Sequence, residues 1–169
     1  KQSAEDPGYS EDHWKTFAEL GWLALPFSEE DGGIGGDAID VMVVMEQFGK
    51  GLVLEPFLAT VVLGGGVLKR TLEGERRAEV IGGIAAGTHK FTLAHTEEQS
   101  RWDLNDVTTS AREDGSDFVL NGSKSVVLAA HTADGIIVSA RTSGGQMDTN
   151  GISLFLVDPK AEGVKVESY

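Results

Sequence analysis

The sequence of 169 residues contains no cysteine, which excludes disulfides and thiolate metal sites. The absence of cysteine fits a reducing compartment, and we predict a cytoplasmic location. No apolar run approaches the roughly 18 residues that a membrane-spanning helix needs. The first residues also lack the basic-then-apolar layout of a secretion signal. We therefore expect neither a membrane span nor a targeting segment.

Basic residues are scarce: 14 Lys and Arg stand against 27 Asp and Glu, for a net charge of −13. Such a chain repels a nucleic-acid backbone, so no nucleic-acid partner is expected. Solubility explains most of the acidic residues. A small phosphorylated ligand stays compatible with this charge, because a few backbone N–H groups can bind a phosphate locally.

The first half of the chain has helical periodicity. Ser10 is a good N-cap for a first helix, and Asp37 can cap a second. Further helical regions are predicted over 54–68 and 74–86. Glycines 64–66 interrupt the third region at a cost of about 1 kcal/mol each relative to alanine. That cost indicates either that the backbone approaches something closely there or that two helices meet there.

A glycine-rich loop over residues 28–36 invites a nucleotide-binding interpretation. However, the loop follows no clear strand, and neither G-x-G-x-x-G nor Walker spacing fits it. We interpret it as a tight connection between two helices.

After residue 88 the apolar period changes to two, which is typical of strands. Hairpin turns are predicted at Asp114-Gly115 and Asn121-Gly122. The predicted strands start at Phe91 and cover 107–111, 118–120, 125–128, 136–140, 152–157 and 164–166. Short strands without intervening helices favour an antiparallel barrel or sandwich. The expected fold class is thus α+β, with a helical N-terminal domain over 1–87 and a middle β-domain over 88–169.

Three sequence blocks together resemble the acyl-CoA dehydrogenase family. They are GWLALPFSEEDGGIGGDAIDVMVVMEQFGKG, LEGERRAEVIGGIAAGTHKFTLAHTE and DFVLNGSKSVVLAAHTADGIIVSAR. Thr96, Glu97 and Asp103 match the family's Thr-Glu-Pro…Gly-Ser-Asp loop. The resemblance implies a helical N-terminal domain that lacks its opening helix, then the middle β-barrel. The family's C-terminal helical domain is expected to be absent from this sequence.

The resemblance implies FAD as cofactor and α,β-desaturation of an acyl-CoA thioester as the reaction. The family's catalytic Glu usually lies in the C-terminal domain, so no catalytic residue is assigned in this sequence. The expected partners are an acyl-CoA substrate, an electron-transfer flavoprotein as electron acceptor, and further dehydrogenase subunits in a homo- or hetero-oligomer. The sequence does not define the acyl group.

Flavin contacts are carried over position by position. Thr96 matches the family Thr that hydrogen-bonds the pyrimidine edge of the isoalloxazine, and Val126-Val127-Leu128 match the family's Trp-Ile-Thr. Here the third position is a leucine, whose side chain offers no hydrogen bond to flavin N5. The residues implied in flavin binding are Leu93, His95, Thr96, Arg101, Trp102, Val126, Val127 and Leu128.

The resemblance also implies an acyl-binding set of Thr60, Gly64, Gly65 and Trp102. Other interpretations stay open: Thr96 as a strand-end hydroxyl, Trp102 as a packing residue and Arg101 as a solvated charge. No tetrahedral ligand set can be assembled from the acids and histidines around residues 89–103, so no metal is predicted.

Because residues 98–102 and 126–128 depart from the family pattern, two rival functions stay open. One is a non-catalytic or flavin-poor partner subunit of a heteromeric dehydrogenase. The other is a flavin-dependent relative with different chemistry, such as oxygenation or oxidation of nitro compounds.

Overall fold

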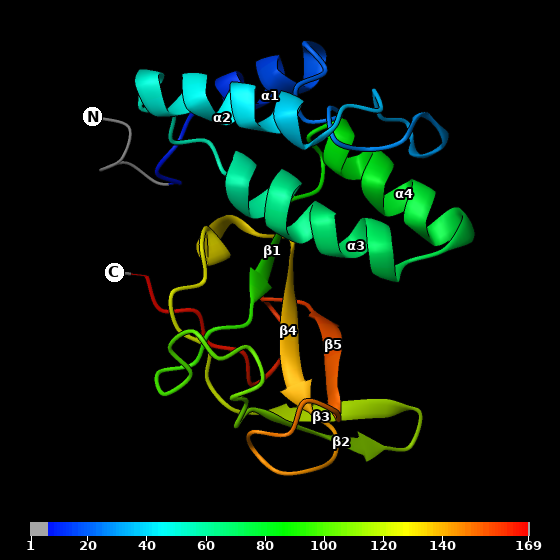
Figure 1. Cartoon of the computed structure of the whole chain (residues 1–169), viewed down its shortest axis with the longest axis vertical. Helices are drawn as coiled ribbons and strands as arrows, with labels where there is room; N and C mark the ends of the chain where they lie inside the picture. The colour runs from blue at the N-terminus through cyan, green and yellow to red at the C-terminus, as the bar shows by residue number, and fades with distance from the viewer. Residues whose placement is uncertain (1–6, 169) are drawn as a thin grey trace. The chain divides into compact units, whose positions relative to one another are not determined.

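The computed structural model describes residues 7–168, which form two compact units. The first unit ends at Phe91 and also contains His131–Asp134, while Thr92–Ala130 and the chain from Gly135 onward form the second. All helical elements except the short η4 (Ala130–Thr132) belong to the first part of the chain, and the strands belong to the later part (Figure 1). The predicted α+β class is therefore confirmed. None of the described helices is long and apolar enough to cross a membrane.

Helices α1 and α2 begin where the sequence places a side-chain acceptor. The Ser10 hydroxyl accepts from the His13 N–H (3.2 Å) at the start of α1. Asp37 forms a reciprocal capping box with Asp40 at the start of α2. The helical elements are α1 (Glu11–Glu19), η2 (Glu29–Asp31), α2 (Ala38–Gly51), η3 (Leu58–Gly64), α3 (Gly65–Thr71), α4 (Gly74–Ala85) and η4 (Ala130–Thr132).

Aromatic side chains form the core of the helical unit. Phe17 stacks on Phe48 with ring centroids 5.1 Å apart, and Phe57 meets Phe48 edge-on at the same distance. Trp14 is fully buried, and its indole N–H donates to the Gly87 carbonyl (3.0 Å) at the end of α4. These contacts join helices that are distant in the sequence.

The third helical region is a π-helix, η3, followed by α3. The Gly65 N–H bonds to the Thr60 carbonyl, five residues earlier. A Cβ on Gly64 would lie 2.6 Å from the carbonyl oxygen of Phe91, and one on Gly65 would lie 2.6 Å from the Phe27 ring. The predicted close approach is confirmed, since these two glycines let other groups pack directly against the helix.

Gly64→Ala is expected to destabilise the helical unit by about 1–3 kcal/mol, because the new methyl group must displace the Phe91 backbone. Gly66→Ala is the matched control: its Cβ would meet nothing closer than 3.9 Å. That substitution should stabilise α3 by about 0.5–1 kcal/mol. Urea unfolding of both variants measures the difference. Equal effects of the two substitutions would contradict this assignment.

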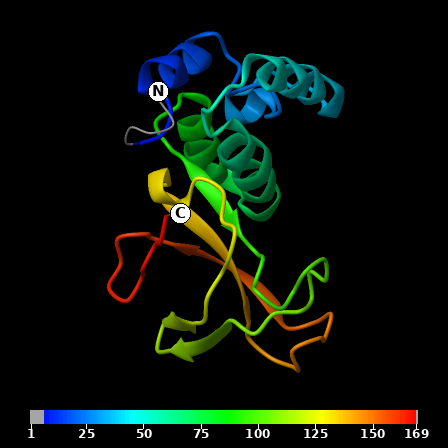
Figure 2. The ribbon, with the colours of Figure 1, turned by 90° about the vertical axis from the view of Figure 1, so that its left-hand side faces the viewer.

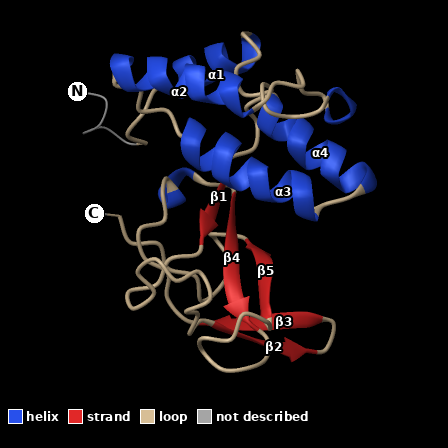
Figure 3. Cartoon of the chain, viewed as in Figure 1, coloured by secondary structure: helices blue, strands red, loops and turns tan. Residues whose placement is uncertain are grey.

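Five strands form one sheet in the order β1-β4-β2-β3, with β5 paired to β4. The strands are β1 (Phe91–Ala94), β2 (Ser110–Asp114), β3 (Asp117–Asn121), β4 (Gly135–Arg141) and β5 (Ile152–Val157). The β2–β3 and β4–β5 pairs are antiparallel, whereas β2 meets β4 in parallel at Ser110 and Arg141. The sheet, whose strands are red in Figure 3, is thus mixed, and the purely antiparallel prediction is wrong. Residues 122–134 connect the end of β3 to the start of β4. They reverse the chain direction, so that β4 runs parallel to β2 where the two strands meet.

The β2–β3 turn at Asp114-Gly115 is confirmed, since Asp114 pairs with Asp117 across a two-residue loop. Three other expectations for this half are wrong: Asn121-Gly122 ends β3 without a hairpin, and 125–128 and 164–166 are not strands. Long loops connect β1 to β2 and β3 to β4 (Figure 2). Val126 has φ 53°, which interrupts the extended backbone that a strand requires.

Candidate functional site

The two segments predicted to face a flavin lie beside each other. The Ser125 N–H donates to the Thr96 carbonyl (2.9 Å), and the Thr92 hydroxyl donates to the Leu128 carbonyl (2.6 Å). These two bonds tie residues 125–128 antiparallel to the end of β1. We call Leu93–Thr96 together with 126–128 the β1 edge site. The structure therefore brings together most of the predicted flavin contacts.

The β1 edge site presents apolar side chains to solvent next to polar groups. Val126 is 65% exposed and Leu128 is 44% exposed. Thr96 is half-buried, and its hydroxyl lies 3.3 Å from Nε2 of the exposed His95 ring. A β-branched residue rarely adopts a positive φ, so Val126 holds a strained backbone. Strain of this kind persists only where the surrounding structure fixes it.

The loop after the β1 edge site carries the two remaining predicted contacts. Trp102 is 94% exposed, so the interpretation of Trp102 as a packing residue does not hold in the structure. Arg101 is also exposed and has φ 44°. A turn bond from the Asp103 N–H to the Ser100 carbonyl (2.8 Å) shapes this tip. Both side chains are available to a ligand or a partner.

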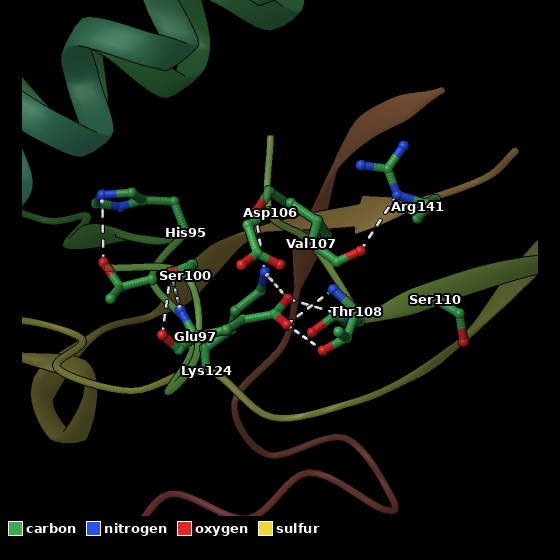
Figure 4. A network of polar contacts seen from close by, with 12 residues as sticks. His95, Glu97, Ser100, Asp106, Val107, Thr108, Ser110, Lys124 and Arg141 are labelled. Atoms are coloured by element: carbon green, nitrogen blue, oxygen red, sulfur yellow. Dashed lines mark hydrogen bonds and ion pairs between the residues drawn. The ribbon is translucent and has the colours of Figure 1, made fainter. Parts of the chain in front are cut away.

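A buried ion pair lies at the base of this loop. Glu97 is 2% exposed, and its carboxylate lies 2.7 Å from the Lys124 ammonium. Lys124 also donates to the Ser139 hydroxyl of β4 (3.0 Å). Figure 4 shows Lys124 and Thr108 directed at this carboxylate. The pair joins the end of β1 to the segment that follows β3.

Further hydrogen bonds complete the coordination of the Glu97 carboxylate. It accepts from the backbone N–H groups of Thr108 (2.9 Å) and Thr109 (3.0 Å), and from the Gln99 amide (2.9 Å). The Thr108 hydroxyl donates to it as well. Burial alone would raise the pKa of Glu97, but the bonds from Lys124, Thr108, Gln99 and Thr109 together lower it below its usual range. The carboxylate is therefore ionised at neutral pH.

Burial lowers the pKa of the Lys124 ammonium, and its hydrogen bond and charge contact with Glu97 oppose that shift. An ammonium in this position costs desolvation energy, which its charged partner Glu97 and the bond to Ser139 offset. The two residues consequently depend on each other.

Arg141, at the end of β4, hydrogen-bonds to two loops. The sequence did not predict this role. Arg141 is 8% exposed and hydrogen-bonds only to backbone carbonyls among the bonds between described residues. The acceptors belong to Asn105, Val107, Ser143, Gln146, Asp148 and Asn150. No residue pattern could have signalled this role, because carbonyl acceptors carry no side-chain identity.

Thr109 has a buried hydroxyl that finds no hydrogen-bond partner among residues 7–168. The Thr109 side chain packs against Gly122. A Cβ on that glycine would lie 2.5 Å from the Thr109 hydroxyl. Thr109→Val keeps the shape and removes the unsatisfied polar group, so we expect it to stabilise the second unit by about 1 kcal/mol. Thermal unfolding checks this. Thr108→Val is the control and should destabilise the unit, since the Thr108 hydroxyl donates to Glu97. A destabilised Thr109→Val protein would contradict the assignment.

The predicted acyl-binding residues fall in both units. Thr60, Gly64 and Gly65 belong to the helical unit, where Thr60 is 2% exposed. The space beside the two glycines is filled by Phe91 and Phe27. A role in acyl binding stays a prediction for this set.

Candidate metal ligands do not assemble. Among residues 7–168, no group of three or more His, Asp or Glu side chains is placed to hold a metal ion. His89 instead packs its ring against α4, where a Cβ on Gly83 would lie 2.1 Å from its Nδ1.

The residues of the β1 edge site fit an isoalloxazine ring. A flat tricyclic ring needs an apolar surface and hydrogen-bonding groups along one edge. Exposed Val126 and Leu128 offer the apolar surface, and the Thr96 hydroxyl can both donate and accept. The Leu128 side chain offers no hydrogen bond, whereas the Trp-Ile-Thr pattern that residues 126–128 resemble has a threonine at this position.

Comparison with known proteins agrees with this geometry. Residues 1–88 match the family profile of the acyl-CoA dehydrogenase N-terminal domain, and residues 92–169 match that of the middle domain. The chain is 31% identical over 157 residues to a Bacillus subtilis protein named probable acyl-CoA dehydrogenase YngJ, covering 92% of the chain and 41% of the relative. It is 30% identical over 151 residues to the caffeyl-CoA reductase-Etf complex subunit CarC of Acetobacterium woodii, covering 88% and 40%.

The FAD complex of PigA has a similar fold, with a TM-score of 0.80 and 25% identity over 91% of this chain and 41% of that one. The chain thus spans about two fifths of the length of these proteins.

Proposed function

The chain belongs to the acyl-CoA dehydrogenase family, and from that premise we propose that its β1 edge site binds FAD in a protein that desaturates an acyl-CoA thioester. The observation that carries the proposal is the pairing of residues 125–128 with the end of β1, which sets exposed Val126 near Thr96 and exposed Leu128 beside Thr92. The similar PigA structure, described as an FAD complex, supports the choice of cofactor.

In this proposal FAD supplies the hydride acceptor. The chain's own residues position it: Val126 and Leu128 cover one face of the ring, and the Thr96 hydroxyl bonds its polar edge. Exposed Trp102 is available to stack on the ring or on the substrate, and Arg101 to pair with a phosphate. We assign the base that removes the substrate proton to none of the residues described here.

The partners follow the same reasoning. We propose an electron-transfer flavoprotein as electron acceptor, supported by the similarity to a subunit of a reductase-Etf complex. Assembly with further dehydrogenase subunits is proposed as well, as is a cytoplasmic location. Domains over 1–87 and 88–169 remain our proposed division of the chain.

Thr96→Val tests the cofactor site directly. Loss of one hydrogen bond should weaken FAD binding about fivefold, since a neutral bond contributes about 1 kcal/mol. Titration of the purified protein with FAD, followed by flavin fluorescence, measures the dissociation constant. Thr71→Val removes an exposed hydroxyl on α3 in the other unit and serves as the control. Equal binding by Thr96→Val and Thr71→Val would remove Thr96 from the site.

A second candidate function is that of a flavin-poor partner subunit. The aliphatic Leu128 and the bulky Trp102 favour it, because both stand where the family pattern has residues that contact the cofactor. A colourless protein that co-purifies with a homologous flavoprotein would establish this role. Stoichiometric FAD in the protein alone, bleached anaerobically by an acyl-CoA, would establish the first. Bleaching only by an unrelated reductant would indicate a relative with different chemistry.

A further inference from the structure

Glu97 connects three segments through one carboxylate. It follows Thr96 directly in the chain, so its backbone is part of the rim of the β1 edge site. Its side chain bonds the start of β2 through the N–H groups of Thr108 and Thr109. The same oxygen that accepts from Thr109 also contacts Lys124 at 2.7 Å. The side chain is 2% exposed, so bulk solvent has little access to these bonds.

Lys124 directly precedes Ser125, the residue that connects the segment 125–128 to the end of β1. Ser125 donates its N–H to the Thr96 carbonyl (2.9 Å), and Lys124 reaches Glu97 one residue further along. Two adjacent residues on one segment are therefore bonded to two adjacent residues on the other. Such a double connection fixes the register of residues 125–128 against β1.

The backbone of the same segment is strained. Val126 and Ala129 both have positive φ, at 53° and 54°, although neither is a glycine. A segment of this kind relaxes unless its ends are held. Lys124 restrains the N-terminal end, and the Thr92 hydroxyl bonds the Leu128 carbonyl near the other.

From this geometry we propose that Glu97 and Lys124 are positioning residues, which hold Val126 and Leu128 in register against the end of β1, where the proposed flavin site lies. The proposal rests on the proposed FAD site. In addition to stabilising the unit, the pair then fixes the local geometry of residues 125–128. Neither residue touches the ring in this arrangement; both act through the segment that Lys124 precedes.

The test uses the neutral double variant Glu97→Gln/Lys124→Met, which removes the ion pair without leaving one charge buried alone. The control is Lys165→Met/Glu167→Gln, which removes an exposed ion pair of the same type. The first readout is hydrogen exchange of the Ser125 amide, measured by NMR without cofactor. The second is the dissociation constant for FAD.

We expect the Ser125 amide to exchange about tenfold faster in the double variant than any general acceleration of the β4 and β5 amides explains. FAD binding should weaken about tenfold as well. Glu97→Asp, which keeps the charge with a shorter reach, should give intermediate values and guards against a double variant that fails to fold. An unchanged Ser125 amide, or equal acceleration throughout β4 and β5, would overturn the positioning role. Failure of the unmodified protein to bind FAD would refute the proposed function, while the exchange rates would still decide the role of the pair.

Discussion

Replacing Lys124 by methionine should destabilise the second unit by about 3–5 kcal/mol, because it leaves the Glu97 carboxylate buried without its charged partner. The side chains of Glu97 and Lys124 are 2% and 7% exposed, so solvent screens their interaction little. Exchange of the β4 and β5 amides at increasing urea concentration measures the free energy of unfolding of this unit.

The control for Lys124→Met is Lys165→Met, whose partner Glu167 is 73% exposed. An exposed pair contributes at most about 1 kcal/mol. The double variant Glu97→Gln/Lys124→Met should lose less stability than the sum of its two single variants, since each single substitution leaves an unmatched group behind. Additive effects would show that the two residues act independently, contrary to the structure.

Arg141→Met should destabilise the second unit by roughly 2–4 kcal/mol, because carbonyl groups of two loops lose a buried donor. Arg141→Lys should recover only part of this loss, since an ammonium cannot reproduce the planar fork that reaches carbonyls on both sides. The same urea-dependent exchange experiment measures both variants.

Arg112→Met, on an exposed position of β2, is the matched control and should change stability by less than about 0.5 kcal/mol. The loss in Arg141→Met should be accompanied by faster exchange of the Val107 amide, which bonds the Gln146 carbonyl between the two loops. A stable Arg141→Met protein with an unchanged Val107 amide would show that the loops hold their shape without the guanidinium.

Local features of the fold could be predicted from the sequence because local chemistry determines them. Ser10 and Asp37 begin helices through bonds to residues at most three positions away. Asp114-Gly115 turns a hairpin for the same reason. Glycines 64 and 65 could be recognised as sites of close approach, although the groups that approach them, Phe91 and Phe27, could not be named.

Long-range features escaped prediction. The run 125–128 has the composition of a strand, but its bonds to Thr92 and Thr96 and the positive φ of Val126 give it another conformation. Lys124 pairs with a carboxylate 27 residues away. The local sequence around Lys124 and around Glu97 does not indicate that the two side chains meet. The parallel contact of β2 with β4 likewise depends on how the chain returns between them.

The central claim is that the β1 edge site binds FAD, and amide chemical shifts recorded during an FAD titration test it most directly. We expect the amides of residues 93–96 and 126–128 to shift together and to saturate at one FAD per chain, while those of α2 stay unchanged. Shifts confined to the helical unit, or none at saturating FAD, would contradict the claim.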